Sequence, residues 1–231
     1  MSLLGEIAIV WSRESEAVLP APLREPVGLG YLLARATDTI ADTAQLAPAL
    51  RRQHLAALAH AIEHGNPAPE AIALLAESFA ALQQDPLERQ LITLLPQCLA
   101  WLARIDAADR DDIRTVLRHI TRGQALDVER FGQASGVRAL ANADELNEYT
   151  WLVAGCVGEF WTAVTAAHVP ALQPLLAPEL LARGVALGRC LQLVNVVRDA
   201  AADLRAGRCY WPRAALALEG LTPVELATLA Q

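Results

Sequence analysis

Apolar residues recur at helical spacing along nearly the whole chain, and no stretch alternates between apolar and polar residues as a half-buried strand does. Alanine and leucine dominate, whereas aromatic and β-branched residues are sparse. That composition favours helices over strands. Proline and glycine interrupt the pattern and mark short loops between the helical segments. The sequence therefore predicts an all-α fold.

The helical pattern divides into seven segments, which we expect at residues 27–46, 48–66, 69–84, 86–105, 109–132, 142–168 and 178–207. Pro26 is well placed to begin the first of them, because proline is favoured at the first helical position. Gly65 is a plausible C-cap of the second segment. Pro96 should kink the fourth. We find no internal domain boundary, so residues 1–231 are expected to form one domain.

Composition excludes several classes of protein. The net charge of −7 argues against a general nucleic-acid binder, which should present a basic surface. The four cysteines are scattered without a C-x-x-C spacing, which favours free thiols in a reducing cytoplasm over a disulfide framework.

No signal peptide is recognisable at the N-terminus. The stretch nearest to a membrane span, residues 151–169, is interrupted by Glu159, so we expect a buried helix there.

Two polar stripes run through otherwise apolar helices. On a helix over residues 27–45, one face carries Tyr31, Arg35, Asp38 and Asp42. On a helix over residues 180–205, one face carries Gln192, Asn195, Asp199 and Asp203. The two pairs of aspartates have the same spacing of four residues. Both helices are apolar around most of their circumference, which predicts burial within a bundle.

Buried carboxylates need a cation or must take up protons. Arg35 and Arg198 are the nearest candidates, but two arginines do not neutralise four aspartates. Mg²⁺ takes carboxylate oxygens and commonly bridges protein acids to substrate phosphates. The stripes therefore favour a magnesium cluster with a diphosphate held between two acidic walls, and the arginines would contact phosphate oxygens. The alternative is a helical bundle whose polar stripes bind a protein partner.

Several motifs carry a family resemblance. "YLLARATDTIAD" and "NVVRDAAADLRAGRCYWP" resemble the two aspartate-rich motifs of the squalene/phytoene synthase family, the head-to-head trans-isoprenyl diphosphate synthases. "YTWLVAGCVGEFW" resembles the segment that lies between them in that family, and "RGQALDVERF" sits where members carry a similar glycine-and-acid segment. The match runs from about residue 12 to about residue 215, in the expected order. Within the family, the chain resembles bacterial squalene synthases.

The resemblance implies an all-α isoprenoid synthase bundle with a central cavity and Mg²⁺-dependent chemistry, with Mn²⁺ as an alternative metal. Carried over by motif, the metal ligands would be Asp38, Asp42, Asn195, Asp199 and Asp203. Arg35 and Arg198 would hold diphosphate, with Tyr31, Gln192 and Arg13 as further substrate contacts. Tyr149 would handle a proton or stabilise a cation near the leaving group, and Asp38 and Asp199 would be essential for turnover.

The implied reaction joins two farnesyl diphosphates through presqualene diphosphate towards squalene. A phytoene synthase acting on geranylgeranyl diphosphate and a non-catalytic family member that acts as an assembly factor are the alternatives. No nucleotide signature decides whether NADPH is used. The segment around Ser12 is shorter than in relatives, and relatives continue through further helices after residue 231. The possibility that this chain is a shortened form therefore stays open. We expect a cytoplasmic protein, with peripheral contact at the inner membrane face for product release.

Overall fold

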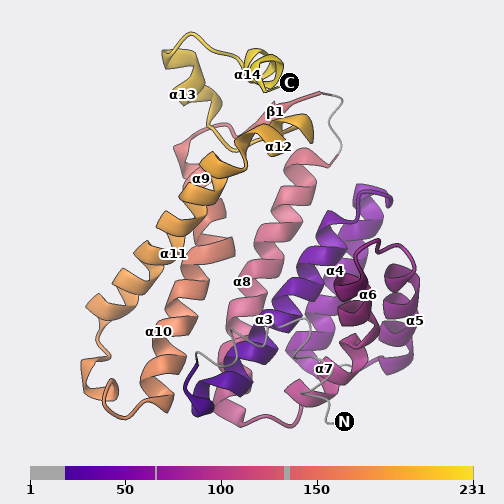
Figure 1. Cartoon of the computed structure of the whole chain (residues 1–231), viewed down its shortest axis with the longest axis vertical. Coiled ribbons are helices and arrows are strands. Elements are labelled where there is room, and N and C mark those ends of the chain that lie inside the picture. The colour runs from indigo at the N-terminus through magenta and orange to yellow at the C-terminus, as the bar shows by residue number, and fades with distance from the viewer. Residues whose placement is uncertain (1–18, 66, 133–135, 231) are drawn as a thin grey trace.

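The computed structural model describes residues 19–65, 67–132 and 136–230, and this part of the chain is helical apart from one short pair of strands (Figure 1). The first half holds α3 (Ala21–Asp42), α4 (Pro48–His64), α5 (Pro69–Ala80), α6 (Pro86–Thr93), α7 (Leu95–Leu102) and α8 (Ala107–Phe131). The second half holds β1 (Arg138–Ala139), α9 (Ala143–Thr150), the π-helix η1 (Trp151–Gly155), α10 (Cys156–His168), the 3₁₀ turn η2 (Gln173–Leu175), α11 (Pro178–Arg198), α12 (Ala200–Arg205), β2 (Arg208–Cys209), α13 (Arg213–Leu218) and α14 (Pro223–Leu229). The prediction of an all-α fold is confirmed.

The main apolar core lies between α3, α4, α8 and α10, and α5, α6 and α7 cover one side of it. Helix α3 runs through this core, and Leu29, Leu33 and Ile40 are fully buried. The predicted start of this helix at Pro26 is wrong, since α3 begins at Ala21 with Pro22 in its first turn. Pro22 is tolerated there because the first N–H groups of a helix have no intrahelical acceptor.

The predicted signals at Gly65 and Pro96 are found in the structure. Gly65 ends α4 in the left-handed conformation (φ 82°), and its N–H donates to the carbonyl of Ala61 at 3.1 Å. The expected helix at 86–105 is divided at Leu94 into α6 and α7, with Pro96 in the first turn of the second helix. Proline lacks the N–H that would continue the ladder, which accounts for the break.

Helices α10 and α11 lie side by side and approach each other through glycine (Figure 1). A Cβ atom at Gly158 would lie 1.9 Å from the carbonyl oxygen of Gly184, and one at Gly188 would lie 2.2 Å from that of Ala154. No side chain fits at such distances, so the two backbones meet directly. The small residues of this segment therefore serve close helix packing.

The predicted burial of the second acidic helix is wrong. Val196 is the one residue of α11 that is buried within the described structure, and Leu187, Leu191, Val194 and Val197 are exposed. Leu191, for example, is 56% exposed. The reason is that α11 packs mainly on α10 and η1, and its opposite side has no neighbour among the described residues (Figure 1).

Helix α11 also replaces residues 151–169 as the most membrane-like segment. It is the one helix among the described residues that is long and apolar enough to cross a membrane, with a mean hydropathy of 1.4. Only 11% of its apolar window is buried. Length and composition alone are weak evidence for a span.

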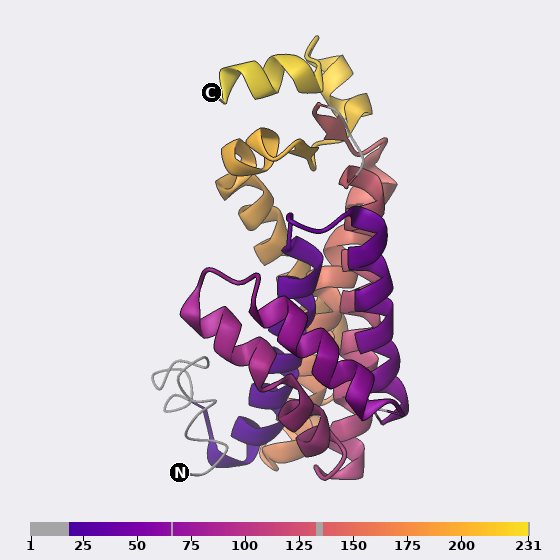
Figure 2. The same cartoon turned by 90° about the vertical axis from the view of Figure 1, so that its right-hand side faces the viewer.

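Beyond the end of the bundle, the chain forms a small unit from α12 to α14 (Figure 2). The expected helix at 178–207 ends at Arg198 and resumes at Ala200 as α12. Strand β2 then pairs in parallel with β1, with Arg208 opposite Arg138. This strand pair was not predicted from the sequence, because strands of two residues carry no alternating pattern that a sequence could reveal.

Candidate active site

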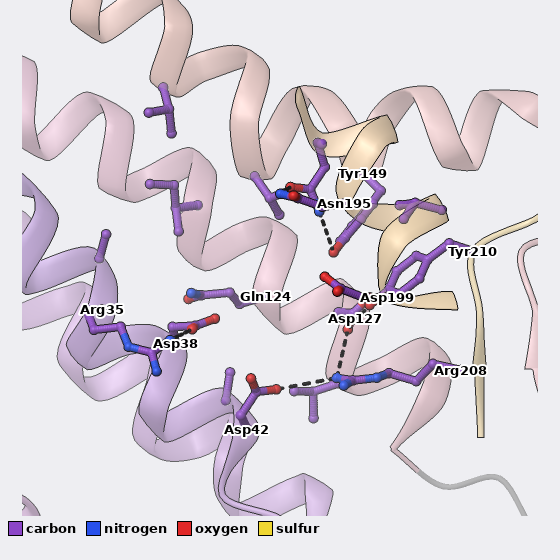
Figure 3. A pocket seen from close by; sticks show the side chains of 18 of the residues that line it. Arg35, Asp38, Asp42, Gln124, Asp127, Tyr149, Asn195, Asp199, Arg208 and Tyr210 are labelled. Atoms are coloured by element: carbon purple, nitrogen blue, oxygen red, sulfur yellow. Dashed lines mark hydrogen bonds and ion pairs between the residues drawn. The ribbon is translucent and has the colours of Figure 1, made fainter. Parts of the chain in front are cut away.

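A cavity of about 1380 Å³ opens between α3, α8, α10, α11 and β2 (Figure 3). Every predicted site residue within the described structure lines it: Tyr31, Arg35, Asp38, Asp42, Tyr149, Gln192, Asn195, Arg198, Asp199 and Asp203. Arg13, the remaining predicted substrate contact, lies outside the described residues. The two stripes therefore face one common space from opposite sides.

The first acidic wall is the part of α3 that carries Asp38 and Asp42. Arg35 donates to Asp38 at 2.6 Å and also pairs with Glu88 of α6. Burial and the neighbouring charge of Asp42 raise the pKa of Asp38, and Arg35 opposes this rise. The repulsion between the two carboxylates is thus only partly compensated by protein cations.

The second acidic wall is the stretch that carries Asn195, Asp199 and Asp203 at the end of α11 and in α12. Arg198 donates from Nε and Nη2 to the two oxygens of Asp199, at 2.8 and 2.7 Å. These hydrogen bonds lower the pKa of Asp199. The expectation of a buried, uncompensated Asp199 is therefore wrong, since this side chain is half-exposed and paired with its own neighbour in the chain.

Arg208 connects the two walls, and sequence reasoning did not single it out. Its guanidinium lies 3.4 Å from a carboxylate oxygen of Asp42 and 3.4 Å from one of Asp203. Burial raises the pKa of Asp203, and the charge of Arg208 opposes that rise. Burial alone would lower the pKa of Arg208, but Tyr210 and the surrounding carboxylates raise it. Arg208 therefore stays charged.

Asp127 of α8 is a further carboxylate in the cavity (Figure 3). The hydroxyl of Tyr210 lies 2.9 and 2.8 Å from its two oxygens, and Arg208 lies 3.9 Å away. Burial raises the pKa of Asp127 to about 6, against the hydrogen bond from Tyr210. The segments "RGQALDVERF" and "GRCYWP" contain these residues, but neither forms a periodic stripe that would have marked them.

Tyr149 lies at the end of α9, where π-helix η1 begins. Its ring stacks on that of Tyr210 with centroids 4.6 Å apart, and Gln192 donates to its hydroxyl at 3.3 Å. Burial raises the pKa of Tyr149, as does the charge of Asp127. The phenol therefore stays protonated at neutral pH, and its O–H is available as a donor.

The cavity has an apolar part beside its charged part. Val153, Val157 and Phe160 line it from η1 and α10, and Ile120 lines it from α8. Gln124 places a side-chain oxygen there that is buried and has no hydrogen-bond partner. An elongated apolar ligand with one charged end would match this division of the surface.

Comparison with known proteins agrees with this geometry. Residues 16–230 match the family model of squalene/phytoene synthases. The chain belongs to this family. A squalene synthase of Candida albicans is 27% identical over 216 residues, which cover 90% of this chain and 44% of that protein. A 15-cis-phytoene synthase of Enterobacter agglomerans is 39% identical over 84 residues, which cover 36% of this chain and 26% of that protein.

The fold has a counterpart among solved structures. A structure of TcSQS with a bound ligand matches with a TM-score of 0.65 at 20% identity, over 90% of this chain and 58% of that one. At this identity the likeness shows the fold. The matched segments cover less than half the length of the Candida albicans and Enterobacter agglomerans relatives.

Membership in the squalene/phytoene synthase family implies Mg²⁺-dependent prenyl diphosphate chemistry. Within the described residues, no three His, Cys, Asp or Glu side chains are gathered closely enough to hold a metal ion. The donor set nevertheless fits a hard cation, because carboxylate and amide oxygens line both sides of the cavity. The raised pKa values of Asp38 and Asp203 also indicate carboxylates in need of positive charge.

Proposed function

We propose that this chain carries the active site of an Mg²⁺-dependent prenyltransferase that joins two farnesyl diphosphates head to head, through presqualene diphosphate towards squalene. The observation that carries the proposal is the meeting of two aspartate pairs, from α3 and from α11–α12, at one cavity with an apolar end. This pattern suits a substrate with a diphosphate head and a long hydrocarbon tail.

The residues that would hold the metal are Asp38, Asp42, Asn195, Asp199 and Asp203. Mg²⁺, when bound, would neutralise diphosphate charge and assist the departure of that group from the allylic carbon. Arg35 and Arg198 would hold diphosphate oxygens, for which the planar guanidinium is suited. Each arginine pairs with an aspartate of the same wall, so each is already placed beside the expected phosphate position.

Tyr149 would serve near the leaving group, as a donor to diphosphate oxygen or by stabilising positive charge. Its protonated hydroxyl and its stack on Tyr210 support that role. Val153, Val157 and Phe160 would position the hydrocarbon chains and exclude water, so that an allylic cation meets the second double bond before it is hydrolysed.

A phytoene synthase that uses geranylgeranyl diphosphate is the second candidate, and local identity favours it. The Enterobacter agglomerans 15-cis-phytoene synthase is 39% identical over its matched segment, against 27% for the Candida albicans squalene synthase over a longer one. A non-catalytic assembly factor is disfavoured, because both aspartate pairs are retained and face the cavity.

We also propose a cytoplasmic location with peripheral membrane contact, which cell fractionation would test.

Incubation with labelled farnesyl or geranylgeranyl diphosphate and Mg²⁺, with and without NADPH, tests the proposal. We expect a C30 product from farnesyl diphosphate, identified by mass, and none from the Asp38→Asn variant. A C40 hydrocarbon made only from geranylgeranyl diphosphate would show that the chain is a phytoene synthase and not a squalene synthase. No condensation product from either substrate, with Mg²⁺ or Mn²⁺, would refute the activity of this chain.

A further inference from the structure

The guanidinium of Arg208 lies among carboxylates that come from three different helices, and Figure 3 shows two of them, those of Asp42 and Asp127. Nη1 of Arg208 is 3.4 Å from Asp42 of α3 and 3.9 Å from Asp127 of α8, and its Nε is 3.4 Å from Asp203 of α12. Asp42 and Asp203 belong to opposite acidic walls. Arg208 is thus the cation that joins the two walls in the described structure.

The backbone of Arg208 is fixed by the β1–β2 pair. The N–H of Arg138 donates to the carbonyl of Gly207 at 3.0 Å, and the N–H of Leu140 donates to that of Cys209 at 3.1 Å. Gly207 has a φ of 81°, a conformation that other residues rarely adopt. The chain can therefore turn sharply from α12 into β2, and the strand pairing holds Arg208 at the cavity edge.

The contacts of the guanidinium are those of a charge held in place by attraction rather than by tight hydrogen bonds. Good N–H···O bonds to a carboxylate are about 2.7–2.9 Å long, and the three distances here are all longer. The Nε of Arg208 is buried and has no hydrogen-bond partner. By contrast, Arg198 makes a close, two-pronged contact with Asp199. Arg208 can therefore exchange its partners at lower cost than Arg198.

We propose that Arg208 is the resident counter-ion of the two acidic walls, that it competes with a divalent metal for Asp42 and Asp203, and that it is released towards the diphosphate when metal binds. This inference rests on the proposed function, because it takes the same aspartates as metal ligands. A metal ion would bind about 2.1 Å from carboxylate oxygens. It would therefore need the space that the guanidinium occupies, and it would supply the positive charge that the guanidinium now supplies.

The competition follows from the charges around Arg208. Repulsion between a divalent ion and a guanidinium a few ångströms away is strong in a partly buried site. Without metal, the same guanidinium offsets the repulsion between Asp42, Asp127 and Asp203. Removal of Arg208 should therefore have two opposite effects: weaker folding of the metal-free protein and tighter binding of the metal.

The test compares Mn²⁺ binding, measured by isothermal titration calorimetry without diphosphate, in the unaltered chain and in the Arg208→Gln and Arg205→Gln variants. Arg205 is the matched control, because it lies three residues away and donates to the carbonyl of Ala230 rather than to a carboxylate. We expect Mn²⁺ to bind at least about tenfold tighter to Arg208→Gln than to Arg205→Gln. The melting temperature of metal-free Arg208→Gln should be the lower of the two, and Mn²⁺ should raise it more.

A second variant keeps the test decisive if Arg208→Gln does not fold. Arg208→Lys retains the positive charge but not the planar guanidinium group, and its Mn²⁺ affinity should lie close to that of the unaltered chain. Inorganic pyrophosphate should bind more weakly to Arg208→Gln in the presence of Mn²⁺. Equal or weaker Mn²⁺ binding in Arg208→Gln, or tighter binding in Arg208→Lys by the full tenfold, would overturn the inference while leaving the proposed function intact. A chain that binds no Mn²⁺ in any form would overturn the metal assignment and this inference together.

Discussion

The two acidic walls have the same aspartate spacing but are supported in different ways. Asp38 and Asp42 project from α3, whose Leu29 and Leu33 are fully buried in the main core. Asp199 lies between α11 and α12, and Asp203 lies in α12; each of these helices buries one residue, Val196 and Leu204 respectively. These two residues belong to two small clusters separate from the main core.

The difference shows that two aspartates four residues apart can be placed in the same site either by a helix of the main core, as in α3, or by a stretch at the periphery, as in α11 and α12. The position of the first wall is fixed by core packing. The position of the second depends on the glycine contact between α10 and α11 and on the short β1–β2 pair. The geometry between the walls is therefore set by a few close contacts, and the following changes should separate the two supports.

Loss of a carboxylate from either wall should have the largest effect. If both walls hold the metal, Asp38→Asn and Asp203→Asn should each reduce kcat/KM at least about 100-fold, because each removes a carboxylate that would hold the Mg²⁺ needed to stabilise the departing diphosphate. Steady-state kinetics with a labelled prenyl diphosphate would measure this, with Glu77→Gln on an exposed face of α5 as the control. A large effect on one wall alone would show that the two are not equivalent.

Truncation of apolar side chains should distinguish the two supporting helices. Leu33 of α3 is 0% exposed, so Leu33→Ala should lower the free energy of unfolding by about 3 kcal/mol. Leu191 of α11 is exposed, and Leu191→Ala should leave that free energy nearly unchanged. Urea denaturation of both variants would measure the contrast. Comparable losses would mean that the exposed side of α11 is covered in solution.

A methyl group at the α10–α11 contact should move the second wall without touching the first. Gly158→Ala places a Cβ against the backbone of Gly184, and we expect a loss of about 2 kcal/mol from overpacking. Gly28→Ala is the control, since no atom lies within 4 Å of the added Cβ and alanine favours a helix. Thermal melting would compare the two. Stability unchanged in Gly158→Ala would contradict the direct backbone contact.

The smallest effect should be a change in the pH dependence of stability. The pKa of Asp127 is raised from 3.8 to about 6 in the folded protein. The stability this group contributes is therefore fully present below about pH 4 and is lost as the pH rises through 6. Asp127→Asn should flatten the fall in melting temperature between pH 4 and 7. Glu129→Gln, an exposed carboxylate on the same helix, should keep the slope, and an unchanged slope in Asp127→Asn would contradict the raised pKa.

The sequence allowed the fold class and both acidic walls of the cavity to be predicted, because helical spacing decides which residues share a face. Asp38, Asp42, Asp199 and Asp203 were placed correctly for this reason. Spacing does not decide what covers a helix, so the burial of α11 was predicted wrongly. Asp127, Arg208 and Tyr210 were missed because only the tertiary fold brings α8 and β2 together. Whether the predicted residues bind metal and substrate stays a prediction.

The wider turn of η1 absorbs one extra residue between Tyr149 and Phe160. A π-helical turn accommodates one residue more than an α-helical turn, and η1 lies between α9, which carries Tyr149, and α10, which carries Phe160. Because the extra residue is taken up within the wide turn, α9 and α10 keep nearly the relative orientation of one continuous α-helix. Insertion of a further residue between Trp151 and Gly155 would exceed what the wide turn absorbs and would rotate α9 by about 100° relative to α10. Tyr149 would then turn away from the cavity while the hydrocarbon-facing surface of α10 stayed in place. The length of this segment, as well as its composition, is therefore constrained.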